Sequence, residues 1–199
     1  MPALDILNNK EELKKLLEKS SLFISLYENF KQGYVESVLG FYANEIEFEN
    51  GDIVYKFTNG DGKEDKTKKL QYEKEVFRTI KKKDGNWDKD ASLFNWLRKR
   101  EDITDEQYEK LLELRIYRNK LVHELDKFLV NSFPTDLDIK IEELLNIRMH
   151  ASKRWYIMFE LPTEDPKSMP FDTNNMNADD LIIYDNSNLL YQLIKEVIK

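Results

Sequence analysis

Residues 104–129, TDEQYEKLLELRIYRNKLVHELDKFL, decide the fold. Thr104 and Gln107 at its start fit a capping box, in which a hydroxyl and an amide satisfy each other's backbone N–H groups. The apolar residues that follow recur at helical spacing. We therefore predict a long helix that begins after Thr104 and runs to about Val130, before Pro134.

Two apolar strips run along this predicted helix when it is projected at about 100° per residue. The first is a core stripe made of Leu111, Leu114, Tyr117, Leu121, Val122, Leu125, Phe128 and Leu129. The second consists of Leu112, Ile116, Asn119 and His123. Its spacing is typical of a seam that meets another helix. Such a helix is either central in its bundle or part of a dimer interface.

Arg118 falls inside the core stripe on the ideal helix. A buried guanidinium is costly, so Arg118 needs a carboxylate, a phosphate or an opening to solvent. It can equally be a structural arginine whose stem packs while its head reaches water. For His123, a role as a hydrogen-bonded interface histidine is a comparable alternative. The residues alone leave these alternatives open.

The hexapeptide Arg118-Asn119-Lys120-Leu121-Val122-His123 resembles the motif of the HEPN superfamily. In that motif an arginine and a polar residue precede a histidine on one helix. The similarity is greatest from about Asp90 to Phe128 and looser over 139–160, and residues 43–83 have no counterpart. The resemblance implies an all-α, HEPN-like helical bundle that is usually dimeric.

The resemblance also implies a function. Many HEPN proteins are metal-independent endoribonucleases of toxin–antitoxin or phage-defence systems, in which Arg and His from two subunits meet in one cleft. Here these residues map to Arg118 and His123, with Asn119 as a supporting polar group. An antitoxin partner is a further expectation. Some HEPN toxins carry, two residues after the histidine, a tyrosine that a partner enzyme modifies; Leu125 stands there, so that form of neutralisation is not expected.

The chemistry of RNA cleavage agrees with these residues. RNA supplies its own nucleophile, the 2′-OH, so the reaction needs a histidine as proton shuttle and a cation for the phosphoryl oxygens. Arg118 and His123 lie about 140° apart on one helix, so a single protomer cannot readily bring both side chains to one phosphate. Two antiparallel copies do so better, and we expect a homodimer through Leu112 and Ile116.

The remaining site expectations concern the ligands. Arg115 and Lys120 are candidates for contacts to RNA, and we expect neither a metal nor a cofactor. A non-catalytic, HEPN-like dimeric binding or assembly module is the alternative function. His150 lies in a basic stretch that could extend an RNA path, but an ordinary helix with a basic outer face is the favoured interpretation.

The rest of the chain predicts one domain, 1–199, of five or more helices and a small hairpin at about 45–57. The Asn50-Gly51 dipeptide predicts a two-residue turn that pairs Phe48 with Ile53 and Ile46 with Tyr55. We expect this apolar face to pack on the helices. The predicted helices cover the first forty residues, with a possible restart at Ser20 or Ser21, then 69–80, from Asp90, from Asp136 or Asp138 to Glu160, and 189–197. Residues 162–180 read as an irregular arm, and we find no internal repeat.

Composition narrows the class of protein. The chain has 199 residues, no cysteine and a formal net charge of −7, which argues against broad, sequence-independent binding to nucleic acid. Charge is uneven, because residues 61–83 hold nine Lys and Arg against five Asp and Glu. Without cysteine there is no disulfide or thiolate site. No apolar run approaches the length of a membrane span, so we expect a cytoplasmic protein.

Overall fold

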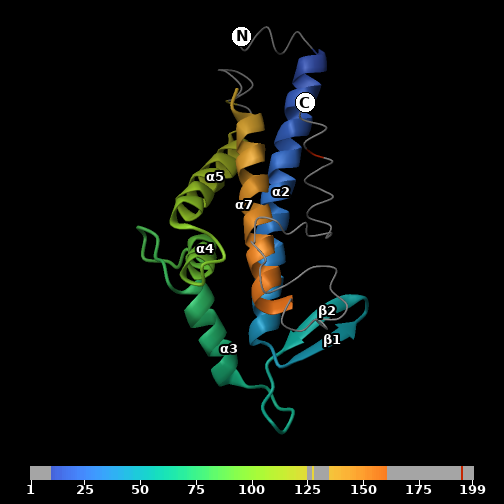
Figure 1. Cartoon of the computed structure of the whole chain (residues 1–199), viewed down its shortest axis with the longest axis vertical. Helices are drawn as coiled ribbons and strands as arrows, with labels where there is room; N and C mark the ends of the chain where they lie inside the picture. Colours follow the sequence, from blue (N-terminus) through green and yellow to red (C-terminus); the bar gives the residue numbers. More distant parts are fainter. Residues whose placement is uncertain (1–9, 125–126, 128–134, 161–193, 195–199) are drawn as a thin grey trace, which may run out of the picture. The chain divides into compact units, whose positions relative to one another are not determined.

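The computed structural model describes residues 10–124, 127, 135–160 and 194. These residues are mostly helical, with one two-stranded antiparallel hairpin (Figure 1). The elements are α2 (Lys10–Tyr42), β1 (Glu45–Glu49), β2 (Asp52–Lys56), α3 (Lys66–Tyr72), α4 (Lys89–Lys99), α5 (Asp105–His123) and α7 (Leu137–Trp155). Two π-helical segments, η1 (Glu73–Phe77) and η2 (Tyr156–Glu160), follow α3 and α7. Within these residues, the predicted five helices and small hairpin are confirmed.

Contacts divide the chain into two compact units. Unit 1 holds Met1–Tyr27 and Arg100–Lys199, and unit 2 holds Glu28–Lys99. The expectation of one domain over 1–199 stays a prediction. The expected arm at 162–180 and the last helix lie outside the described residues, except for Ile194, which is buried.

In unit 1, α5 contacts α7, and three of the leucines predicted for its core stripe face inward, together with Tyr108, which was not predicted. Leu111, Leu114 and Leu121 are fully buried. Val122 is exposed, so its assignment to the core stripe is wrong. The helix also ends earlier than predicted, at His123, because Glu124 leaves helical geometry at φ −128°.

Helix α2 runs without interruption through the serines where a restart was considered. The Ser20 hydroxyl donates a hydrogen bond of 2.8 Å to the Leu16 carbonyl within the same helix. This back-bonding keeps the hydroxyl satisfied without breaking the helix. Ser20 therefore marks no boundary.

The hairpin of unit 2 has the predicted register, with Phe48 opposite Ile53 and Ile46 opposite Tyr55. Asn50 and Gly51 take φ values of 54° and 93°, as a tight hairpin turn requires. The expectation that the apolar face packs on helices is wrong for most of it, because Ile46, Phe48 and Ile53 are exposed. Tyr55 is the exception: its ring lies over Gly40, where an added Cβ would come within 3.3 Å of it.

A turn-and-helix unit occurs twice in unit 2, 23 positions apart. In the first copy, Asp65 N donates to Phe57 O, Asn59 N to Lys63 O, and Gly62 N to Asn59 O. The second copy repeats each bond, from Asp88 to Ile80, from Lys82 to Asn86, and from Gly85 to Lys82. Gly62 and Gly85 both have positive φ, 72° and 84°. Each turn therefore closes as a short loop with a left-handed glycine.

Each of these turns leads into a helix through an aspartate. Asp65 Oδ1 accepts from the backbone of Lys68 at 3.1 Å, and Asp88 Oδ1 accepts from that of Ala91 at 3.2 Å. The two copies share the pattern Asp-Gly-x-x-Asp-Lys, at 61–66 and 84–89. The expectation that the chain has no internal repeat is therefore wrong, and Asp65 moves the start of the predicted 69–80 helix to Lys66.

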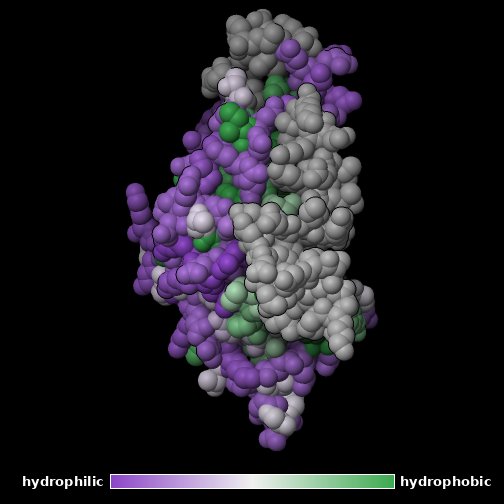
Figure 2. Space-filling model, in the orientation of Figure 1, coloured by the Kyte–Doolittle hydropathy of each residue, from purple (hydrophilic) through white to green (hydrophobic). Residues whose placement is uncertain are grey.

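On the face that Figure 2 shows, the described surface is largely hydrophilic, with separate hydrophobic patches. Among the described helices, none is long and apolar enough to cross a membrane.

Candidate functional site

Helix α5 carries the motif, and its start is fixed by the predicted capping box. Gln107 N donates to Thr104 Oγ1 at 3.1 Å, and Thr104 N donates to Gln107 Oε1 at 3.0 Å. Two backbone donors that the first helical turn would leave unpaired are satisfied in this way. The capping box thereby sets where α5 begins.

Tyr117 fixes the rotation of α5 within unit 1. Its ring meets Phe23 edge to face, with centroids 5.4 Å apart, and its hydroxyl donates to Asp136 Oδ1 at 3.1 Å. Burial, followed by the negative charge of Asp136, raises the pKa of Tyr117 well above its ordinary value. The hydroxyl therefore remains a hydrogen-bond donor at neutral pH.

Lys110 ties α5 to α7. Its Nζ lies 3.2 Å from carboxylate oxygens of both Glu113 and Glu143. Hydrogen bonds to Glu143 and then Glu113 raise the pKa of Lys110, so the ammonium stays charged. Together with Tyr117, this bridge determines which side of α5 faces away from the core.

The second strip of α5 lies on that outward side. Leu112 is half-buried, Ile116 is 54% exposed, and Asn119 and His123 are exposed. An exposed apolar side chain such as Ile116, followed along the strip by two exposed polar motif residues, is typical of a helix seam that no partner covers. Within the described chain the seam faces solvent.

Arg118 is half-buried, and its Nη1 donates to Asn119 Oδ1 at 3.0 Å. The sequence left three environments open for Arg118: a carboxylate, a phosphate or an opening to solvent. Its partial exposure shows that it has an opening to solvent. The hydrogen bond aligns the planar guanidinium beside the Asn119 amide. Arg118 and Asn119 are thus brought together at the end of α5.

His123 is the last residue of α5, where Glu124 N closes the helix on Lys120 O at 2.8 Å. Over the part of the chain that the structure describes, its imidazole makes no hydrogen bond or ion pair. The ring is therefore accessible to a ligand. Because Arg118 lies five positions earlier on the same straight helix, the two side chains point in directions about 140° apart.

The two residues expected to contact RNA differ in environment. Lys120 is exposed, while Arg115 is half-buried on the same helix. Lys120 neighbours Arg118 and Asn119 in sequence, so it adds positive charge at that end of α5. Arg115 lies one turn away from them.

The basic stretch around His150 belongs to α7, where His150 is half-buried. The nearby Trp155 and Phe159 rings stack with centroids 4.4 Å apart, and Arg154 Nε donates to Glu101 O at 3.1 Å. These contacts join α7 and the segment after it to their own unit. They agree with the interpretation of this stretch as an ordinary helix with a basic outer face.

Sequence reasoning missed a buried carboxylate in the turn before α5. Asp102 is fully buried, with Arg100 Nε at 3.5 Å. Burial raises the pKa of Asp102 above its ordinary value, and the positive charge of Arg100 opposes that shift. The polar run around Asp102 gave no sign of burial, although Ile103 beside it is buried as well.

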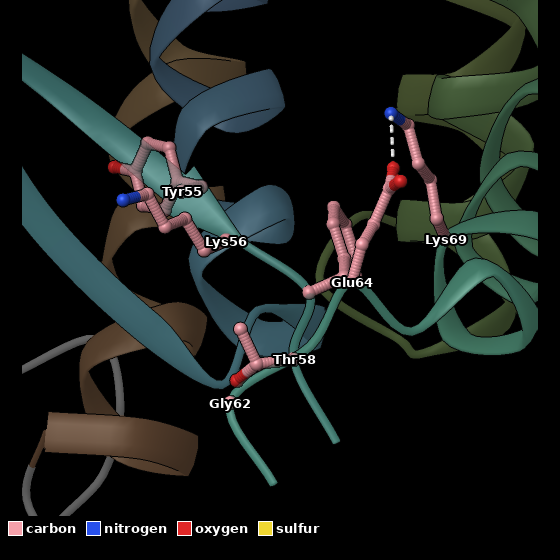
Figure 3. A pocket seen from close by; sticks show the side chains of 7 residues that line it. Tyr55, Lys56, Thr58, Gly62, Glu64 and Lys69 are labelled. Carbon is pink, nitrogen blue, oxygen red and sulfur yellow. Dashed lines mark hydrogen bonds and ion pairs between the residues drawn. The ribbon is translucent and has the colours of Figure 1, made fainter.

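A pocket of about 300 Å³ lies beside the hairpin in unit 2 (Figure 3). Its lining consists of Tyr55, Lys56, Phe57, Thr58, Gly62, Glu64 and Lys69. Lys69 lies 3.4 Å from Glu64 across one side, and Lys56 pairs with Glu47 and Glu49. Since both ammonium groups are already paired with carboxylates, their attraction for an anionic ligand is weakened.

Among the described residues no group of three or more His, Asp or Glu side chains is placed to hold a metal ion. Comparisons with protein-family models, with curated proteins and with solved structures find no match for this chain.

Proposed function

We propose that this chain is a metal-independent endoribonuclease of the HEPN type, acting as a homodimer in a toxin–antitoxin or phage-defence setting. The observation that carries the proposal is the outward strip of α5, which holds the exposed Ile116 and an accessible His123, with a half-buried Arg118 hydrogen-bonded to Asn119 of that strip. A second copy packed against Ile116 would cover the apolar side chain and approach both polar ones.

The reaction that suits these groups is transfer of the phosphoryl group to the neighbouring 2′-oxygen. The O2′–P bond forms while the P–O5′ bond breaks, which leaves a 2′,3′-cyclic phosphate and a 5′-hydroxyl. One imidazole accepts the 2′-OH proton and an imidazolium gives a proton to the departing 5′-oxygen. Within one cleft a single His123 can perform both transfers in turn, first taking the proton and then giving it up as the imidazolium. Arg118 offsets the charge that grows on the phosphoryl oxygens.

The second candidate is a dimeric binding module without catalysis. The hydrogen bond from Arg118 to Asn119 and the net charge of −7 favour it, because one guanidinium donor is occupied and the chain repels phosphate at long range. In that case the same strip holds the dimer together and cuts nothing.

Cleavage of a labelled RNA in EDTA separates the two. We expect cleavage without metal, resistance of a substrate with 2′-deoxyribose at the scissile position, and a loss of about 10²–10⁴-fold in His123→Ala. His150→Ala is the matched control, since it removes the other histidine of the chain and should retain activity. Arg118→Lys should rescue Arg118→Ala only in part, because an ammonium lacks the planar fork.

Mixed dimers give the sharper form of the test. A dimer of one His123→Ala protomer and one Arg118→Ala protomer keeps one complete cleft if each cleft takes the two residues from different protomers. Partial recovery of cleavage on mixing the variants is therefore expected. Wild-type cleavage that survives His123→Ala unchanged would discard the nuclease in favour of the binding module.

A further inference from the structure

The two turns of unit 2 offer an internal comparison, because they share a backbone and differ in side chains. Thr58, Asn59 and Gly60 of the first turn correspond to Lys81, Lys82 and Lys83 of the second. Glu64 corresponds to Trp87, and each of these two closes an equivalent bridge, with Thr58 and Lys81 respectively. The first turn closes without lysine or tryptophan at these positions. The backbone of the second turn therefore does not depend on its lysines or its tryptophan.

The two turns also differ in charge. Residues 57–66 hold two lysines against three acidic residues, whereas 80–89 hold four lysines against two aspartates. Lys81, Lys82 and Lys83 are exposed, and none of them lies in an ion pair with a carboxylate of the described chain. By contrast, Lys56 and Lys69 beside the first turn are paired with glutamates. The second turn is thus a local basic site on an acidic protein.

Trp87 adds an aromatic surface to this basic turn. It is 40% exposed, and Lys81 Nζ lies 4.9 Å from the centroid of its ring. An indole that already accepts a cation on its face can accept a planar base in the same way. The Lys81 ammonium beside the ring, with Lys82 and Lys83 next in sequence, offers positive charge for the phosphates of a stacked strand.

We propose that the turn Lys81–Trp87 binds single-stranded RNA, with a base stacked on Trp87 and phosphates contacted by the three lysines. The choice of RNA rests on the proposed function, since a nuclease must hold its substrate away from the scissile bond as well as at it. An anionic membrane is disfavoured as the ligand, because insertion into a lipid interface needs an extended apolar face, and this turn presents one aromatic side chain.

The test uses the full chain with His123→Ala, which removes the proton shuttle, and a short labelled single-stranded RNA followed by fluorescence anisotropy. The loop variant K81T/K82N/K83G transplants the side chains that the first turn carries on the same backbone. We expect weaker binding and a shallower dependence of log Kd on log salt, by about 2 for three lost phosphate contacts to a single strand. Trp87→Gln should weaken binding by at least about fivefold.

A matched control removes the same number of positive charges elsewhere. K14Q/K15Q/K63N replaces three exposed lysines outside the second turn and should leave the affinity within about twofold. Equal losses of RNA affinity in the loop variant and in this control would overturn the proposal. Binding to anionic lipid vesicles is measured in parallel. A loop variant that loses vesicle binding and keeps RNA binding would also overturn the proposal. Circular dichroism checks that each variant is folded.

The two proposals fail in different ways. If wild-type protein cuts no RNA but the loop variant loses RNA binding, the turn is an RNA site and the nuclease assignment falls. If wild-type protein cuts RNA and the loop variant binds as the parent does, the nuclease stands and the turn is not its RNA site. Absence of RNA binding by the parent overturns the inference.

Discussion

Ile116→Ala tests the outward strip of α5 at its apolar centre. Burying a whole isoleucine side chain stabilises a structure by about 1.5–3 kcal/mol. Ile116 is 54% exposed in the protomer, so a partner that covers it adds roughly half of that, about 1 kcal/mol. A two-fold dimer contains the contact twice, which gives about 2 kcal/mol, and a tenfold change in Kd corresponds to about 1.4 kcal/mol. The dimer Kd should therefore rise about 30-fold.

Sedimentation velocity over a range of concentrations measures this Kd. Ile139→Ala on α7 is the matched control, because Ile139 is 58% exposed and is not on the strip. It should leave the Kd unchanged. A wild type that stays monomeric at the highest concentration, or equal shifts in both variants, would refute the reasoning.

Two further predictions concern stability. Thr104→Ala removes the capping box and should lower the free energy of unfolding by about 1 kcal/mol in urea titrations, whereas Thr67→Ala, on an exposed helical threonine without a side-chain bond, should change little. Burial raises the pKa of Asp102 above its ordinary 3.8, with Arg100 opposing the shift, so the folded chain holds this proton more tightly than the unfolded chain. This group's contribution to stability is then largest at low pH and falls as pH rises from the unfolded to the folded pKa. Asp102→Asn should remove that dependence, and a constant difference between wild type and variant across the acidic range would contradict it.

Local signals predicted the parts of the fold that local chemistry controls. The capping box of α5 and the register around Asn50-Gly51 depend on residues a few positions apart, and both are confirmed. Helical spacing likewise identified the buried leucines of α5. In the candidate site it also predicted that Ile116 and His123 share a strip apart from the core.

Non-local properties were harder to predict. The hairpin register shows that Phe48 and Ile53 share a face, but it does not say what covers that face, and Phe48 remains 78% exposed. The ideal wheel placed Val122 inside, although it flanks the core stripe and lies beside the helix end. The repeated turn was not predicted from the sequence, because its two copies share few residues and are alike mainly in their backbone hydrogen bonds.

Both proposals rest on side chains that the fold does not require. The inward leucines and Tyr117 hold α5 in place, so Ile116 and His123 are not needed for its packing. The first turn likewise shows that the second would close without Lys81–Lys83 or Trp87. The net charge of −7 does not cancel such sites, because salt screens exposed charges beyond about 10 Å at 0.1 M, so a bound phosphate responds chiefly to the lysines beside it. On these two proposals, an acidic chain with an exposed basic turn and a helix end that carries Arg118 and His123 would hold RNA at a few defined points rather than along its whole surface.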